Sequence, residues 1–260
     1  MKQLRILAVS LSAVALSASA LAGNTYVWNW NEGDAGNPNN GGGTFKKVSA
    51  SYNVNTQTLG WYMTFGAVPG SPSLQTDGFW MALSSGPNPK GHAGQLAIFY
   101  MDAKSNTPVL NVFAYNGVNG DNSYKDGSAA SGTQAPDKIA SSLVDNSFVQ
   151  DLSVVVNADG TRTLGFTVKV DQINGHNPLY PGPNGPSEWE GAMFGEKIGV
   201  WAHSVAGLAR SYSNGYLTNF TYQKTGWLDL ENQNTTVVPE PATLAVLGAG
   251  ALALVRKRRK

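Results

Sequence analysis

The stretch "NADGTRTLGFTVKVD", residues 157–171, decides the fold class. Apolar residues alternate in it with small or polar ones: Leu164, Phe166, Val168 and Val170 against Gly165, Thr167 and Lys169. A period of two predicts a β-strand with one buried and one solvent-facing side. Asp159-Gly160 is a strong short-range hairpin signal. It predicts antiparallel pairing with the preceding run "DLSVVVN", residues 151–157.

The rest of the chain contains similar short β-prone runs, separated by Gly, Asn, Pro, Asp and Ser. No stretch keeps a 3.6-residue period for three turns, so we expect little helix. About ten strands favour an antiparallel β-sandwich, because sheets this large split or close to bury their apolar faces. No internal repeat favours a propeller or a solenoid. The ten expected strands are 26–31, 45–53, 58–66, 78–84, 95–102, 109–116, 148–157, 163–171, 197–204 and 216–223.

Two segments rich in Gly, Asn and Pro are expected as long loops, residues 31–44 and 174–191. The all-β domain is expected to cover residues 23–224. Residues 225–238 then read as a linker that leaves the domain.

The N-terminus has the form of a secretory signal. Lys2 and Arg5 precede an apolar run, residues 6–16, and the small-x-small pattern Ala20-Leu21-Ala22 follows. We expect a signal helix over residues 1–22 that signal peptidase removes after Ala22, with Ala20 as the alternative. A buried N-terminal helix is the competing interpretation.

The C-terminal apolar run, residues 242–255, has 14 residues, fewer than the roughly 20 that a membrane-spanning helix needs. A short span still works where flanking cations reach the headgroups. The run therefore predicts a short transmembrane helix in the precursor. Five cations follow it: Arg256, Lys257, Arg258, Arg259 and Lys260.

Pro239-Glu240-Pro241, the apolar run and the basic cluster together resemble the PEP-CTERM sorting signal of Gram-negative bacteria. The resemblance covers residues 239–260. It implies that exosortase, a membrane enzyme, processes the tail during export across the inner membrane to the cell surface or the extracellular matrix. A simple tail anchor is the alternative.

Removal of both ends changes the charge of the protein. Without Lys2, Arg5 and the five terminal cations, 11 of the 18 basic residues remain, and without Glu240, 16 of the 17 acidic residues remain. A net charge of −5 argues against a nucleic-acid partner, which requires a basic surface. The chain has no cysteine, which excludes disulfides, cysteine-ligated zinc and a cysteine nucleophile.

The strand order over residues 24–224 is similar to that of concanavalin A-like jelly rolls, the lectin and glucanase superfamily. The segments that carry the likeness are "DGFWMALSSGPNPKGHAGQLAIFYMD", "EKIGVWAHS" and the closing "LTNFTYQ". The resemblance implies a lectin-like sandwich. The Glu-x-Asp-x-(x)-Glu strand of the glucanases does not occur in this sequence.

Catalytic motifs are scarce. Two carboxylate pairs have the i, i+2 spacing that a glycosidase could use, Glu188 with Glu190 and Asp229 with Glu231. Their loop and linker contexts favour solvated acids. The sequence has no Gly-x-Ser-x-Gly elbow, and its three histidines lack metal-ligand spacing: His92, His176 and His203. We therefore expect no catalytic residue and no enzyme activity.

Calcium is the most plausible metal, because it accepts oxygen ligands from flexible loops. Asp121, Asn122 and Asp126 are candidate ligands, with a solvated turn as the alternative. No other cofactor is expected.

Aromatic residues give the remaining signal. Tyr26, Trp28 and Trp30 share one face of a strand, and Asn29 and Asn31 lie on the other. We consider Trp28, Trp30, Asn29 and Asn31 as a glycan-binding rim beside the loop at 31–44, with a core role for the indoles as the competing interpretation. The strand tryptophans of the middle and late chain are expected in the core: Trp61, Trp80 and Trp201.

These observations predict an exported, non-enzymatic surface or matrix protein with a lectin-like sandwich that engages extracellular polysaccharide. The alternatives are a secreted glycan-cleaving enzyme and a purely structural matrix protein.

Overall fold

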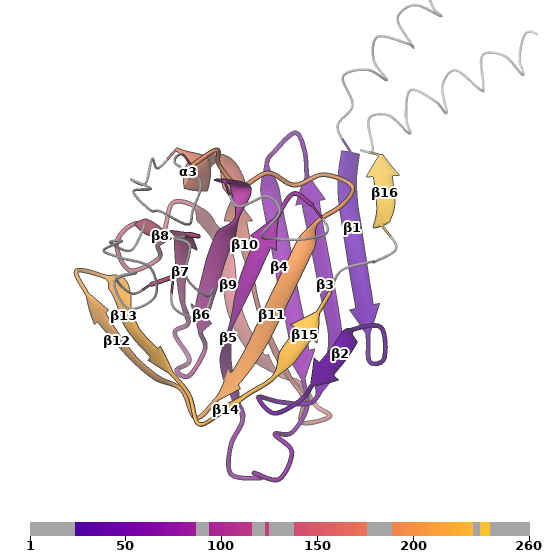
Figure 1. Cartoon of the computed structure of the whole chain (residues 1–260), viewed down its shortest axis with the longest axis vertical. Coiled ribbons are helices and arrows are strands. Elements are labelled where there is room, and N and C mark those ends of the chain that lie inside the picture. Colours follow the sequence, from indigo (N-terminus) through magenta and orange to yellow (C-terminus); the bar gives the residue numbers. More distant parts are fainter. Residues whose placement is uncertain are drawn as a thin grey trace, which may run out of the picture.

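The computed structural model describes residues 24–86, 94–115, 123–124, 138–175, 189–230 and 235–239. Two antiparallel sheets lie face to face in a sandwich-like arrangement (Figure 1). The six-stranded sheet has the order β16 (Thr235–Pro239), β1 (Asn24–Asn31), β3 (Phe45–Asn53), β4 (Thr58–Phe65), β10 (Arg162–Lys169) and β9 (Val149–Val156).

The eight-stranded sheet packs on it. Its order is β2 (Gly36–Asn39), β15 (Trp227–Asp229), β11 (Gly199–Ala206), β5 (Thr76–Ser84), β6 (Ala97–Asp102), β7 (Val109–Ala114) and β8 (Lys138–Ser141), and β14 (Lys224–Thr225) pairs with β11. A hairpin of β12 (Ala209–Ser213) and β13 (Tyr216–Thr221) forms a two-stranded sheet of its own, and a short helix, α3 (Val170–Asn174), follows β10.

The hairpin that decides the fold class is confirmed. Strand β10 pairs antiparallel with β9, and Leu164 lies opposite Val154. The turn is closed by the Asn157 N–H, which donates to Thr161 O at 2.8 Å, and Gly160 adopts a positive φ of 80°. A glycine is needed here because other residues rarely adopt this conformation. The alternating burial of β10 follows the predicted period of two.

All ten predicted strands occur, with ends shifted by a few residues. Six further strands were not predicted: β2, β8, β12, β14, β15 and β16. All six have two to five residues, too few to establish a period. Strand β2 lies inside the expected loop at 31–44 and contains Gly36 and Pro38, which disfavour a strand in sequence terms. Short edge strands form because the sheet beside them offers unpaired backbone groups.

The described parts of the expected linker, residues 225–230 and 235–238, contain strand. They contribute to β14, β15 and β16, which pair with β11 and β1. The domain therefore extends past residue 224 up to the first residues of the C-terminal tail. The polar, proline-poor sequence there gave no sign of strand pairing.

The main core lies between the two sheets. It contains the largest buried side chains of the described residues, among them Trp28, Trp30, Trp61, Phe99 and Phe166. The rings of Phe99 and Phe166 come from opposite sheets and stack at 5.3 Å between centroids. Burial of aromatic area on this scale supplies much of the stability of a domain without disulfides.

A second core lies on the outer side of the eight-stranded sheet. The β12–β13 hairpin covers β5, β6 and β7 there, and Phe220 packs on Tyr100 with 5.5 Å between ring centroids. These three strands are consequently buried on both faces. This explains why their sequences are continuous apolar runs without alternation.

Candidate functional site

The predicted glycan-binding rim at Trp28 and Trp30 is wrong. The strand alternates as expected, with Asn29 and Asn31 exposed, but the two indoles point between the sheets with exposed fractions of 0% and 2%. Trp28 Nε1 donates to the Glu196 carbonyl at 3.2 Å. Burial against the opposite sheet removes the stacking surface that a sugar needs.

The candidate acid pairs cannot be assembled from the described residues. Glu188 and Glu231 lie outside them. Glu190 accepts a hydrogen bond from Gln95 Nε2 at 3.0 Å, and Asp229 lies on β15, opposite Trp201 of β11. Glu190 and Asp229 therefore lie in separate segments, and the partner of each, Glu188 or Glu231, is not among the described residues.

The remaining candidates are similarly placed. Asp121, Asn122 and Asp126 lie outside the described residues, as do His92 and His176. Within the described part of the chain, no three His, Asp or Glu side chains come close enough to hold a metal ion. His203 is described, and its surroundings point to a different kind of site.

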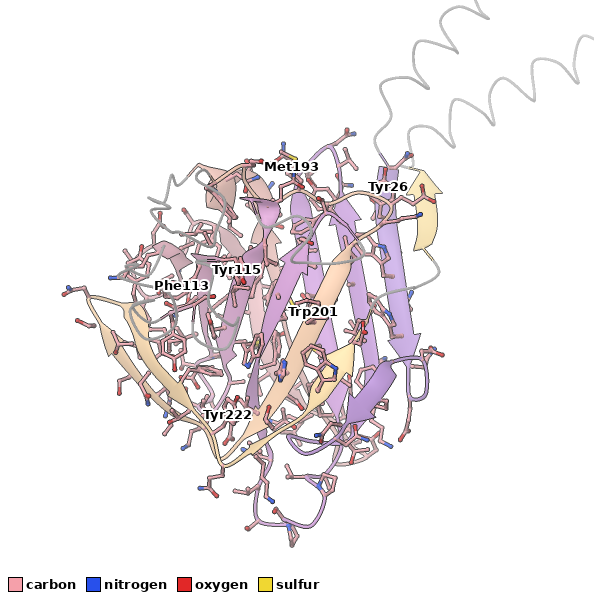
Figure 2. The ribbon with its side chains drawn as sticks, in the orientation of Figure 1. Tyr26, Phe113, Tyr115, Met193, Trp201 and Tyr222 are labelled. Carbon is pink, nitrogen blue, oxygen red and sulfur yellow. The ribbon has the colours of Figure 1, made fainter. Side chains whose placement is uncertain are left out.

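Four aromatic side chains form a continuous surface on the outer side of the eight-stranded sheet, which we call the aromatic face: Trp80, Trp201, His203 and Trp227. Three adjacent strands supply them: Trp80 from β5, Trp201 and His203 from β11, and Trp227 from β15. Trp201 and Trp227 are half-buried. Figure 2 shows the Trp201 ring on the open part of β11, away from the β12–β13 hairpin.

His203 joins the two ends of this surface. Its ring stacks on Trp80 with 4.0 Å between centroids and an interplanar angle of 11°, and it meets Trp227 at 4.4 Å and 66°. Burial lowers the pKa of His203 to about 4, and a backbone hydrogen bond with Gly226 partly offsets this effect. The imidazole is therefore neutral at neutral pH and acts as a spacer between two indoles rather than as a charge.

The aromatic face is open because the hairpin covers only part of the sheet. Trp80 is 6% exposed and lies at the edge of the second core, whereas Trp227 lies next to the edge strand β2. The exposed Asn39 of β2 lies opposite Trp227 in register. A stacking surface with an amide at its margin suits a ligand that has both apolar faces and hydroxyl groups.

Sequence reasoning missed this surface. The prediction of a core position is confirmed for Trp61 and Trp80, whereas Trp201 is only partly buried and packs against the second core. Trp227 lies in the segment read as a linker. The spacing Trp201-x-His203 places both on one side of a strand, but no sequence feature indicated that the hairpin leaves this side uncovered.

The outer side of the six-stranded sheet is mainly polar. An open hollow of about 370 Å³ lies there beside Tyr62 and above Gly60. The Tyr62 hydroxyl donates to Asp151 Oδ2 at 2.8 Å, and its ring lies over Gly165, where a Cβ would come within 2.2 Å of Tyr62 Cδ1. Tyr62 is the one aromatic residue among the described residues that line this hollow, so the hollow offers less stacking surface than the aromatic face.

The sorting tail begins at the edge of the six-stranded sheet. Strand β16 pairs antiparallel with β1, and Pro239 lies opposite Asn24. Both ends of the described domain thus meet at one corner of the sandwich (Figure 1). None of the described helices is both long and apolar enough to cross a membrane, and the apolar run at 242–255 lies outside the described residues.

Comparison with known proteins identifies this tail. Residues 237–260 match the PEP-CTERM protein-sorting motif. The motif marks the chain as an exported protein that exosortase sorts and processes during export, consistent with a place at the cell surface. No curated protein and no solved structure matches the chain.

Proposed function

We propose that this exported PEP-CTERM protein is a non-catalytic polysaccharide-binding protein whose binding surface is the aromatic face. The observation that carries the proposal is the partly buried pair Trp201 and Trp227, joined through His203 to the buried Trp80. The two indoles stand 6.1 Å apart at 40°. Their side chains are held by packing below them, so little rotamer freedom is lost on binding.

A neutral polysaccharide is the favoured ligand class. Indole faces stack on the apolar C–H faces of pyranose rings, and amides such as that of Asn39 bond hydroxyl groups. The mature chain carries a net charge of −5, which repels polyanions approaching from solution. The neutral His203 adds no positive charge to attract them.

Further parts of the proposal concern architecture and setting. We place the sandwich with the lectin-like jelly rolls, on a precursor that carries a signal helix and a short transmembrane helix, in a Gram-negative envelope. Calcium binding at Asp121, Asn122 and Asp126 remains a prediction. The absence of catalysis is likewise proposed, since the Glu190 carboxylate accepts a hydrogen bond from Gln95 and its i, i+2 partner lies outside the described residues.

A glycan-array screen of the purified mature protein, with calcium and with a chelator, tests the proposal. We expect neutral polysaccharides among the ligands and about a tenfold or greater loss of affinity in the double variant Trp201→Ala/Trp227→Ala, because central aromatic contacts contribute more than about 1.4 kcal/mol. Reducing-end assays on the same ligands should show no turnover.

The matched control is Tyr62→Ala, which removes an aromatic ring from the opposite outer side. It should bind as the parent does. Loss of binding in Tyr62→Ala with full binding in the double variant would move the site to the six-stranded sheet and overturn the assignment. If no glycan on the array bound the protein, the alternative of a purely structural role in the matrix would be favoured.

A further inference from the structure

Strand β16 and the sorting motif share residues. The motif covers residues 237–260 and β16 covers Thr235–Pro239, so residues 237–239 belong to both. In the folded domain these residues are paired with β1, with Val237 opposite Tyr26 and Val238 opposite Thr25. The first part of the recognised sequence is therefore held as the edge strand of the sandwich.

This pairing sets the length of chain between domain and membrane. Only two residues lie between Pro239 and Ala242, where the apolar run begins, and the three steps from one Cα to the next span about 10 Å when extended. With the run held at the membrane, the corner that contains Asn24 and Pro239 lies close against it. A membrane enzyme has no room to reach residues 237–241 from the side.

Detachment of β16 removes this limit. The chain then runs freely from Leu230, the last residue before β16 that the structure describes. Eleven residues lie between Leu230 and Ala242, and this stretch extends to about 40 Å. That length is comparable to the diameter of a small domain.

We propose that β16 controls processing: exosortase acts on the tail only after β16 has separated from β1. The fold of the domain and its sorting then compete for the same three residues, 237–239. Strand β1 can give them up because it keeps its other neighbour, β3, over seven paired residues from Thr25–Asn53 to Asn31–Lys47. An edge strand is also the part of a sheet that opens most readily.

A disulfide between β1 and β16 tests the proposal. Val27 and Thr236 lie opposite one another, and opposite positions of antiparallel strands are about 4.5–5.5 Å apart at Cα, within disulfide range. The chain has no native cysteine, so the double variant Val27→Cys/Thr236→Cys can form only one intramolecular disulfide. Residue 236 lies outside the matched motif, so the recognised sequence stays intact.

Precursor and processed protein are followed by immunoblot in cells that process the parent chain, and alkylation identifies the disulfide-bonded fraction. We expect that fraction to be processed at least about tenfold more slowly than the parent and to be released by a reductant. The control pair Asn29→Cys/Ser49→Cys locks β1 to β3 at two exposed, opposite positions and should be processed at the parent rate.

A second variant works in the opposite direction. Thr236→Pro removes a backbone N–H and weakens β16, so its processing should be as fast as that of the parent or faster. The proposal is overturned if the disulfide-bonded Val27→Cys/Thr236→Cys fraction is processed at the rate of the control pair, or if Thr236→Pro is processed more slowly than the parent.

Discussion

Replacement of Trp30 with alanine is expected to lower the free energy of unfolding by about 3 to 5 kcal/mol while leaving polysaccharide binding unchanged. Trp30 is 2% exposed and packs on Trp61 with 5.6 Å between ring centroids. Among the described residues its Nε1 has no hydrogen-bond partner. The loss is therefore one of packing, from the cavity left between the sheets.

Urea denaturation of Trp30→Ala measures this loss. Trp30→Phe keeps a ring in the same place, and we expect it to recover a large part of the stability. Unchanged stability together with loss of ligand binding in Trp30→Ala would show that this indole is exposed and functional. In that case the inner side of β1 would be a binding surface and not the core.

Replacement of Arg162 with methionine is the second large effect that we expect, also about 3 to 5 kcal/mol. Arg162 lies on β10 of the six-stranded sheet, is 8% exposed, and reaches the end of the other sheet. Its guanidinium donates to the carbonyl oxygens of Thr76 and Ala103, the latter at 2.7 Å from Nη2. Asp77 Oδ1 lies 4.0 Å from Nη1.

The large cost follows from what the arginine leaves behind. Burial lowers the pKa of Arg162, and Asp77 opposes this effect. Asp77 in turn accepts hydrogen bonds from the N–H groups of Gly207 and Leu208, at 2.9 and 3.1 Å. Without the guanidinium, a buried carboxylate loses its counter-charge and two carbonyl groups lose their donors.

Denaturation of a matched surface variant gives the control. Lys46 pairs with Glu32 at 2.8 Å, but their side chains are 37% and 60% exposed, so Lys46→Met should cost less than about 1 kcal/mol. In the double variant Arg162→Met/Asp77→Asn, removal of both charges should restore part of the loss. If Arg162→Met and Lys46→Met lowered the free energy of unfolding equally, the contacts of Arg162 with the other sheet would have no special structural role.

The sequence predicts much of the fold because strands with one buried side carry their own pattern. The alternation of β10 and the Asp159-Gly160 turn were sufficient to place it beside β9 with the correct orientation. Patterns cannot show which sheet lies opposite which strand. The short strands β14, β15 and β16 depend on edges supplied by distant residues, and for that reason they read as a linker.

The candidate site was harder to predict for a related reason. Trp201 lies on a strand with apolar neighbours, Val200 and Ala202, and sequence alone does not distinguish an inner from an outer side when both are apolar. The β12–β13 hairpin covers part of the outer side and leaves Trp201 and Trp227 only partly buried. The polar loop at 31–44 suggested a glycan-binding site at Trp28 and Trp30, but the side of β1 that carries these indoles faces the other sheet.

Oxidative footprinting with and without a bound polysaccharide tests the central claim most directly, because the oxidation of each aromatic side chain reports its own contact with solvent. We predict that a ligand identified by the array slows oxidation of Trp201 and Trp227 and leaves Tyr62 unchanged. Protection of Tyr62 with no change at Trp201 and Trp227 would contradict the assignment of binding to the aromatic face.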